Sequence, residues 1–243
     1  MVEILISKVN QVEKMEAQGT HVLVRKLYGS RAVKTGVALP IKRALVERRI
    51  SIKLERIGRR KPYDISVAAA KKSSPRINIM PYIEGRTLRS VPASEWPKPK
   101  QLRNLGMFIA EVERGIGPGI FLGLMLTSQK LGRIIRAYKT GSSALGRGVY
   151  FSLGDATLAN TLLTSKGICL LDFEFGHMSN GGFDVAMLAA EIHQLIKQGA
   201  PLGYARSALL QGYTSGGGSL PAVLVWRNRL LKYQSARKFN GGV

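Results

Sequence analysis

Three polar side chains flank a short predicted β-hairpin in the second half of the chain. The hairpin strands are expected at 161–163 and 168–171, with Asp155 and Asn160 before the first strand and Asp172 after the second. Because a tight hairpin returns the chain close to where it began, we expect the three side chains to converge at one end. Two carboxylates and one amide oxygen suit a hard cation such as Mg²⁺. A carboxylate beside that cation can also orient a hydroxyl group and accept its proton.

Length and composition narrow the classes of protein that this chain can represent. It has 243 residues, of which 45% are hydrophobic, so it can fold as one large domain or two small lobes. Its single cysteine, Cys169, excludes an internal disulfide and suits a small buried apolar residue. With only three histidines besides, a structural zinc site is not expected.

The charge of the chain is strongly basic. Lys and Arg number 37 against 15 Asp and Glu, which gives +22, and nine of the basic residues fall within 41–62. Such a charge suits an anionic partner: nucleic acid, an anionic lipid or a phosphorylated substrate. The N-terminus lacks a signal-peptide pattern, and the most apolar stretch, 115–126, is shorter than the roughly 20 residues of a membrane-spanning helix. We therefore expect a cytoplasmic protein, with a peripheral position at a membrane as the alternative.

The remaining patterns predict a β-rich first third and a helical remainder. Alternation predicts an antiparallel hairpin over 12–28 and a strand from Ile77 whose ladder ends at Pro81, which has no N–H to donate. Helical spacing predicts a basic amphipathic helix within 41–61, with Gly58 as its stop. After a proline-bearing connector, further helices are expected at 101–114, 128–138, 184–198 (capped by Asp184), 203–212 and 221–237.

The pattern D-x-x-x-x-N, hairpin, D-F-E resembles the catalytic core of the protein-kinase-like superfamily, in its aminoglycoside phosphotransferase and choline kinase branch. The resemblance extends over about 12–233, and 182–186 and 209–213 are similar to later segments of that branch. It implies an α+β bilobal fold, with a small β-rich N-lobe at 1–84 and a larger helical C-lobe at 85–243. ATP would bind between the lobes.

The resemblance also implies roles for individual residues. Asp155 would be the catalytic carboxylate that faces the acceptor hydroxyl, and Asn160 and Asp172 would hold Mg²⁺ on the ATP phosphates. Lys26 would reach the α- and β-phosphates, and Glu47 would pair with Lys26. A solvated partner for neighbouring cations of its own helix is the alternative for Glu47.

Four further positions are implied at the adenine site. Met80 would be the gatekeeper, the Pro81 carbonyl and the Ile83 N–H would meet the adenine edge, and Val24 could cover the base. For the phosphate-binding base, two rivals to Lys26 stay open in the sequence, namely Arg25 and Lys34.

The chain departs from the pattern of the superfamily at three places. Leu153 stands where the family usually has a His that braces the catalytic loop, and Glu174 stands where protein kinases have Gly. No glycine-rich phosphate loop precedes the first hairpin, where only residues 7–10 lie.

The function implied is an ATP- and Mg²⁺-dependent phosphotransferase that acts on a hydroxyl of a small molecule. The extended segment between 115 and 148 is typical of the small-molecule branch, which enlarges this region around the acceptor. One alternative is an atypical kinase that acts on a protein, a tRNA-associated assembly or a lipid-linked sugar. The other is a catalytically impaired, kinase-like binding module, which the missing glycine loop and Leu153 favour. The sequence does not choose between ATP and GTP.

Overall fold

The computed structural model describes most of the chain, in nine segments: 2–5, 11–16, 22–27, 40–60, 63–74, 77–117, 150–173, 176–179 and 181–239. Outside these residues lie the helix expected at 128–138, the segment 7–10, Lys34, Glu174 and most of the segment 115–148, including most of its apolar stretch 115–126.

The N-terminal part contains a five-stranded antiparallel sheet. Its strand order is β1 (Val2–Leu5), β2 (Gln11–Glu16), β3 (Val22–Leu27), β6 (Ile77–Pro81) and β5 (Lys72–Ser74). The expected hairpin is therefore confirmed as β2 and β3, and β6 ends at the proline that cannot extend the ladder.

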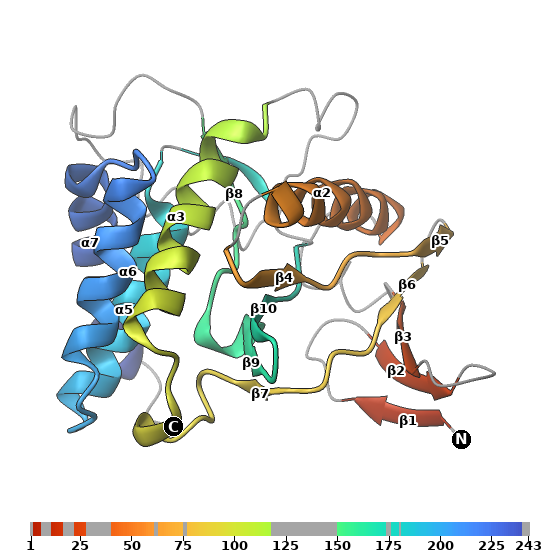
Figure 1. The fold of residues 1–243 in the computed structure, drawn as a ribbon, viewed down its shortest axis with the longest axis horizontal. Coiled ribbons are helices and arrows are strands. Elements are labelled where there is room, and N and C mark those ends of the chain that lie inside the picture. Colours follow the sequence, from red (N-terminus) through yellow and green to blue (C-terminus); the bar gives the residue numbers. More distant parts are fainter. Residues whose placement is uncertain are drawn as a thin grey trace.

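The basic helix is α2 (Pro40–Arg60), which lies over β4 (Ile65–Val67) and β5 in Figure 1. Its buried side includes Ile50 and Leu54, both with no exposed surface. The prediction that Gly58 ends this helix is wrong, because the helix continues for two more residues. A Cβ at Gly58 would lie 3.0 Å from the Ile65 carbonyl oxygen, so this glycine permits the close approach of β4.

A second sheet joins residues from the two halves of the chain. Its strand order is β4, β10 (Gly167–Leu170), β9 (Thr161–Thr164) and β7 (Arg86–Thr87), with β4 parallel to β10. The hairpin expected between Asn160 and Asp172 is confirmed as β9 and β10. A separate two-stranded pair, β8 (Tyr150–Ser152) and β11 (His177–Ser179), brackets the hairpin in sequence.

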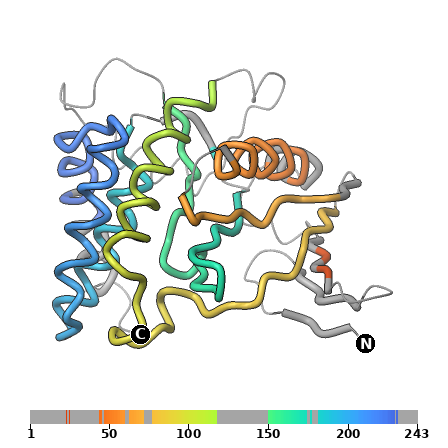
Figure 2. The backbone as a smooth tube through the Cα atoms, in the orientation of Figure 1, coloured from red at the N-terminus to blue at the C-terminus, as the bar shows by residue number. Residues whose placement is uncertain are grey.

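Four long helices form the C-terminal part: α3 (Pro99–Gly115), α5 (Phe183–Lys197), α6 (Gly203–Ser215) and α7 (Leu220–Phe239). They lie side by side in Figure 2. Helix α3 packs against α6, and α5 contacts both α6 and α7. The helices expected in these regions are confirmed. The expectation that Asp184 caps α5 is wrong, because Gly182 is at the N-cap and Asp184 turns inward.

Glycine pairs allow α3 and α6 to pack closely. A Cβ at Gly212 would lie 1.9 Å from the Arg103 carbonyl oxygen, and one at Gly106 would lie 2.2 Å from the Leu209 carbonyl oxygen. Elsewhere on α3, the fully buried ring of Phe108 packs edge-on against Tyr63. No helix within the described residues is long and apolar enough to cross a membrane.

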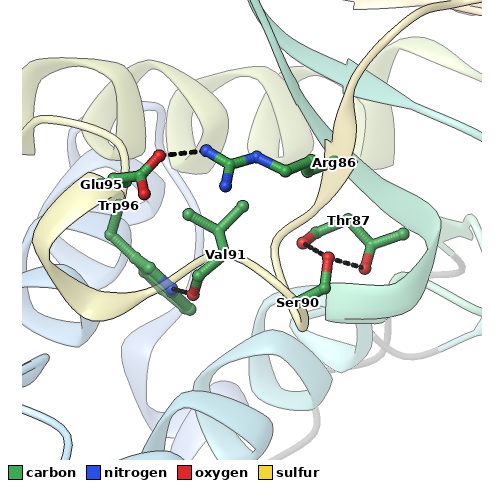
Figure 3. Close-up of polar contacts among 6 residues, drawn as sticks. All are labelled: Arg86, Thr87, Ser90, Val91, Glu95 and Trp96. Carbon is green, nitrogen blue, oxygen red and sulfur yellow. Dashed lines mark hydrogen bonds and ion pairs between the residues drawn. The ribbon is translucent and has the colours of Figure 1, made fainter.

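The connector from β7 to α3 is pinned by its own polar side chains. Arg86 forms an ion pair with Glu95, Ser90 bonds to Thr87, and the indole N–H of Trp96 donates to the Val91 carbonyl over 3.1 Å, as Figure 3 shows. A short 3₁₀ turn, η1 (Ala93–Glu95), lies within it. The connector is therefore held in place where it passes the second sheet.

Candidate active site

The loop that follows β8 brings Asp155 and Asn160 into direct contact. The side-chain amide of Asn160 donates to the Asp155 carbonyl oxygen over 3.0 Å and to its carboxylate oxygen Oδ2 over 3.1 Å. The short 3₁₀ turn η4 (Leu158–Asn160) provides this geometry, with Thr157 as its N-cap accepting from the Asn160 N–H. The side-chain amide of Asn160 thus fixes the orientation of the Asp155 carboxylate.

The hairpin brings the backbone of Asp172 to the same place. The N–H of Leu171 donates to the carbonyl of Asn160 over 2.9 Å, where the two strands end side by side. Asp172 has a φ of 61°, in the left-handed region that is costly for residues other than glycine. Such backbones persist where the surroundings over-determine them, and they cluster at active sites and ligand clamps.

The donor set at this end of the hairpin fits a magnesium ion bound together with a nucleotide. The described residues contain no group of three or more His, Cys, Asp or Glu side chains that could hold a metal by themselves. The site instead combines two carboxylates, Asp155 and Asp172, with the amide of Asn160. Mg²⁺ is usually bound in this way, by one or two carboxylates, with substrate phosphates and water completing the coordination.

Asp184 braces the start of the loop from α5. Its carboxylate is fully buried and accepts from the Ser152 hydroxyl (3.0 Å), the Leu153 N–H (2.7 Å) and the Gly154 N–H (3.1 Å). Burial raises the pKa of Asp184 to about 6, and the hydrogen bonds from the loop oppose this shift. The side chain of Leu153 is itself buried in the core, so the loop is held here through its backbone.

A second buried acid, Glu113 of α3, lies next to this brace. It accepts from the Gly182 N–H over 2.9 Å and from the Tyr213 hydroxyl over 2.6 Å. Burial raises the pKa of Glu113 to about 8, and the charge of nearby Asp184 adds to the shift. Glu113 also lines a cavity of about 170 Å³ between α3, α6 and the start of α7. Sequence reasoning missed this residue; the available signal was an acid within the apolar pattern of a predicted helix.

The residues that the resemblance assigns to nucleotide binding lie on β3, β6 and α2, and just beyond β6. Glu47 is 2% exposed, so its carboxylate is not solvated. The side-chain amide of Asn78 donates to the Ala44 carbonyl over 3.1 Å and lies 3.5 Å from Glu47 Oε2. In the backbone register, Lys26 is directly opposite Asn78, whereas Arg25 is opposite Ile79.

The segment expected to meet adenine lies at the end of β6 and just beyond it. Val24 is opposite Met80 in the register, and Leu23 is opposite Pro81. Met80, Pro81 and Ile83 are half-buried. The structure thus brings Val24 and Met80 to neighbouring positions on adjacent strands.

The fold is shared with small-molecule phosphotransferases of known structure. Macrolide 2'-phosphotransferase MphH from Brachybacterium faecium superposes with a TM-score of 0.63 at 17% identity, over 100% of this chain and 88% of that one. A choline/ethanolamine kinase family protein from Mesorhizobium loti gives 0.58 at 15% identity, over 100% and 82%. Amicoumacin kinase hAmiN, solved with AMP-PNP, Ca²⁺ and Ami, gives 0.58 at 13% identity, over 95% and 79%.

No family profile and no curated protein sequence matches the chain. The structural likeness nevertheless confirms the predicted kinase-like fold of mixed helix and sheet, which this chain shares with a macrolide phosphotransferase and a choline/ethanolamine kinase family protein. At these identities it is the fold that is shared.

Proposed function

We propose that this chain is an ATP- and Mg²⁺-dependent phosphotransferase that moves the γ-phosphate to a hydroxyl group of a small molecule. The observation that carries the proposal is the left-handed backbone of Asp172, beside the Asn160 whose amide binds Asp155. A strained backbone at Asp172, next to the oriented carboxylate of Asp155, is costly in a loop with only a structural role and useful in a catalytic loop. The small-molecule acceptor is supported by the macrolide, choline and amicoumacin kinases that share the fold.

Each residue of the loop has a distinct part in the proposed chemistry. Asp155 orients the acceptor hydroxyl and takes its proton as the oxygen attacks the γ-phosphorus, while the bond from that phosphorus to the β,γ-bridging oxygen breaks and ADP leaves. Asn160 keeps the Asp155 carboxylate in one orientation and, with Asp172, offers oxygen ligands for Mg²⁺. When bound, the metal neutralises charge on the phosphate oxygens.

For the phosphate-binding base we propose Lys26, paired with Glu47. Directly opposed residues of an antiparallel pair share a face of the sheet, and Lys26 is opposite Asn78, whose side chain lies against Glu47. Arg25 is one residue out of step and belongs to the other face. A buried acid such as Glu47 also needs a cationic or hydrogen-bonding partner.

At the adenine site we propose that Val24 and Met80 contact the base and that the Pro81 carbonyl and Ile83 N–H meet its edge. The register of β3 with β6 supports the first pair, and the end of β6 at Pro81 leaves that carbonyl beyond the ladder. We propose the lobe boundary at 84/85, just after this segment. ATP is available in the cytoplasm, where we propose that the enzyme acts, with a peripheral position at a membrane as the alternative.

The central experiment measures ATP hydrolysis without acceptor and the Mg·ATP-dependent shift in melting temperature. We expect Asp155→Asn to lower hydrolysis by at least about 100-fold while keeping the thermal shift, because the carboxylate acts on the attacking oxygen. Asp172→Ala should lose both, and Lys166→Ala, in the exposed hairpin turn, should lose neither. Near-normal hydrolysis by Asp172→Ala would reject this site.

The alternatives have their own outcomes in the same experiment. If wild-type protein shows no thermal shift with millimolar Mg·ATP, the chain is a kinase-like binding module. If it hydrolyses ATP, ATP labelled in the γ-phosphate identifies the acceptor class. Metabolites, protein, RNA-associated fractions and lipid-linked sugars are separated after the reaction, and the label is counted in each.

We also propose an anionic partner on the basic side of α2. Among the side chains of this helix that the structure describes, five cations are exposed: Arg48, Arg49, Lys53, Arg56 and Arg59. Glu55 pairs with one of them, Arg59, over 2.7 Å. Neutralising Arg49, Lys53 and Arg56 to Gln should lower the salt slope of RNA binding by about one unit per cation removed.

Binding is measured with RNA and with vesicles of anionic lipid, and the matched control neutralises Lys98, Lys100 and Arg103, which are exposed at the start of α3. Equal losses in the two triple variants would mean that net charge, not the α2 surface, attracts the partner.

A further inference from the structure

Leu158, midway between Asp155 and Asn160, is held at both of its backbone polar atoms. Its N–H donates to the Glu191 carboxylate oxygen Oε2 over 2.6 Å, and its carbonyl accepts from the Arg89 N–H over 3.3 Å. Its side chain is only 2% exposed. One residue of the loop is therefore fixed from α5 on one side and from the connector on the other.

The N–H of Leu158 needs an acceptor from outside its own turn. Leu158 is the first residue of η4, and the first N–H groups of a helix have no partner within the helix. The N-cap residue Thr157 uses its hydroxyl on the Asn160 N–H instead. In this buried position the Glu191 carboxylate supplies the missing acceptor.

Burying the charged carboxylate of Glu191 is unfavourable unless its contact with the Leu158 N–H compensates for the cost. Burial raises its pKa, whereas the Leu158 N–H and the charge of Arg89 lower it. It lies seven residues, about two helical turns, after Asp184 on α5. The same side of α5 thus meets the loop twice, at Leu153 and Gly154 through Asp184 and at Leu158 through Glu191.

We propose that Glu191 is a positioning residue for the catalytic loop, acting through Leu158. By holding the middle of the loop, it fixes the turn that presents the Asn160 amide to Asp155. The N–H of Arg89 binds the Leu158 carbonyl, and Arg89 belongs to the connector that the Arg86–Glu95 ion pair holds in place. Leu158 therefore joins the loop to the connector, which follows the proposed adenine site. The inference rests on the proposed phosphotransferase function.

The test compares two variants of similar size. Glu191→Gln keeps an oxygen that can accept from Leu158, whereas Glu191→Met fills the space without an acceptor. Lys197→Ala, exposed at the end of α5, is the control. Hydrogen exchange of the Leu158 amide reports the contact, and kcat and KM for ATP in acceptor-free hydrolysis report its consequence.

We expect Glu191→Met to speed exchange of the Leu158 amide about tenfold and to lower kcat by roughly 10- to 100-fold, with KM for ATP changed little. Glu191→Gln should restore slow exchange and most of kcat. Unchanged exchange or unchanged kcat in Glu191→Met overturns the inference, and so does a Gln variant that behaves like Met. If the wild-type protein hydrolyses no ATP, the proposed function fails, and the exchange data still decide whether the clamp exists.

Discussion

The N–H of Leu153 donates to the Asp184 carboxylate over 2.7 Å, and this bond joins the start of the loop after β8 to the first turn of α5. In the kinase-like pattern that this sequence resembles, a histidine that braces the loop usually stands where this chain has Leu153. Here the backbone is braced instead, and the Leu153 side chain is free to pack into the core. The loss of the histidine is therefore compatible with a well-positioned loop.

Removing the Asp184 carboxylate should destabilise the protein and disorder the loop. Asp184→Ala leaves two buried N–H groups and the Ser152 hydroxyl without this acceptor, and we expect it to lower the free energy of unfolding by about 3 kcal/mol. Chemical denaturation measures the change. Ser152→Ala removes one donor to Asp184 and one acceptor of the Gly154 N–H, which keeps Asp184 as an acceptor, so it should cost about 1 kcal/mol. Similar losses in both variants would contradict the brace.

Because the backbone of Asp172 is strained, we expect glycine at this position to give a more stable protein than alanine, the reverse of the usual order. Both substitutions remove the carboxylate, but only glycine adopts a φ of 61° without strain. We expect Asp172→Gly to be more stable than Asp172→Ala by about 1 kcal/mol, measured by urea denaturation. Both variants should lose Mg·ATP-dependent turnover. An alanine variant as stable as the glycine variant would argue against the left-handed conformation.

The buried acid Glu113 predicts a stability that falls with rising pH. Burial raises its pKa from 4.5 to about 8, so between these values the folded state holds a proton that the unfolded state has released. The stabilisation is complete below pH 4.5 and is lost as the pH rises through about 8. Glu113→Gln resembles the protonated form and should flatten the fall in melting temperature between pH 6 and 9. Asp184, whose pKa is about 6, contributes in the same direction at lower pH.

Glu113→Gln separates the contributions of Glu113 and Asp184 to the pH dependence of the melting temperature. The fall in melting temperature that remains below pH 7 in this variant belongs to Asp184. The melting curves of both proteins are compared in the same buffers. A wild-type melting temperature that is flat from pH 6 to 9 would contradict the protonated state of Glu113.

The contact between α3 and α6 predicts a large cost for one added methyl group. A Cβ at Gly212 would lie 1.9 Å from the Arg103 carbonyl oxygen, so Gly212→Ala must push the helices apart and should cost about 3 kcal/mol or more. Gly203→Ala, at the start of the same helix, meets no atom within 4 Å and should be neutral or slightly stabilising. Calorimetry of both variants provides the comparison. A tolerated Gly212→Ala would mean that the helices are farther apart.

Much of the element pattern follows from local sequence. The β2–β3 and β9–β10 hairpins and the helices α2, α3, α5, α6 and α7 were all predictable, because alternation, helical spacing and turn residues act within a few positions of the chain. The errors at Gly58 and Asp184 have a common cause. Both residues look like helix-terminus signals, but each serves a contact with another element: β4, which follows α2 directly, for Gly58, and the distant loop after β8 for Asp184.

The sequence by itself determined which residues stand before and after the hairpin, Asp155, Asn160 and Asp172, and its resemblance to a known motif implied the kinase-like fold. Only the tertiary structure decided what holds them: the left-handed turn at Asp172, the buried acids Asp184 and Glu113, and the Glu191 contact to Leu158. The physical reason is that a spacing pattern records neighbours along one element. Burial and hydrogen bonding of a carboxylate depend on which other elements pack against it, and those elements lie tens of residues away in the chain.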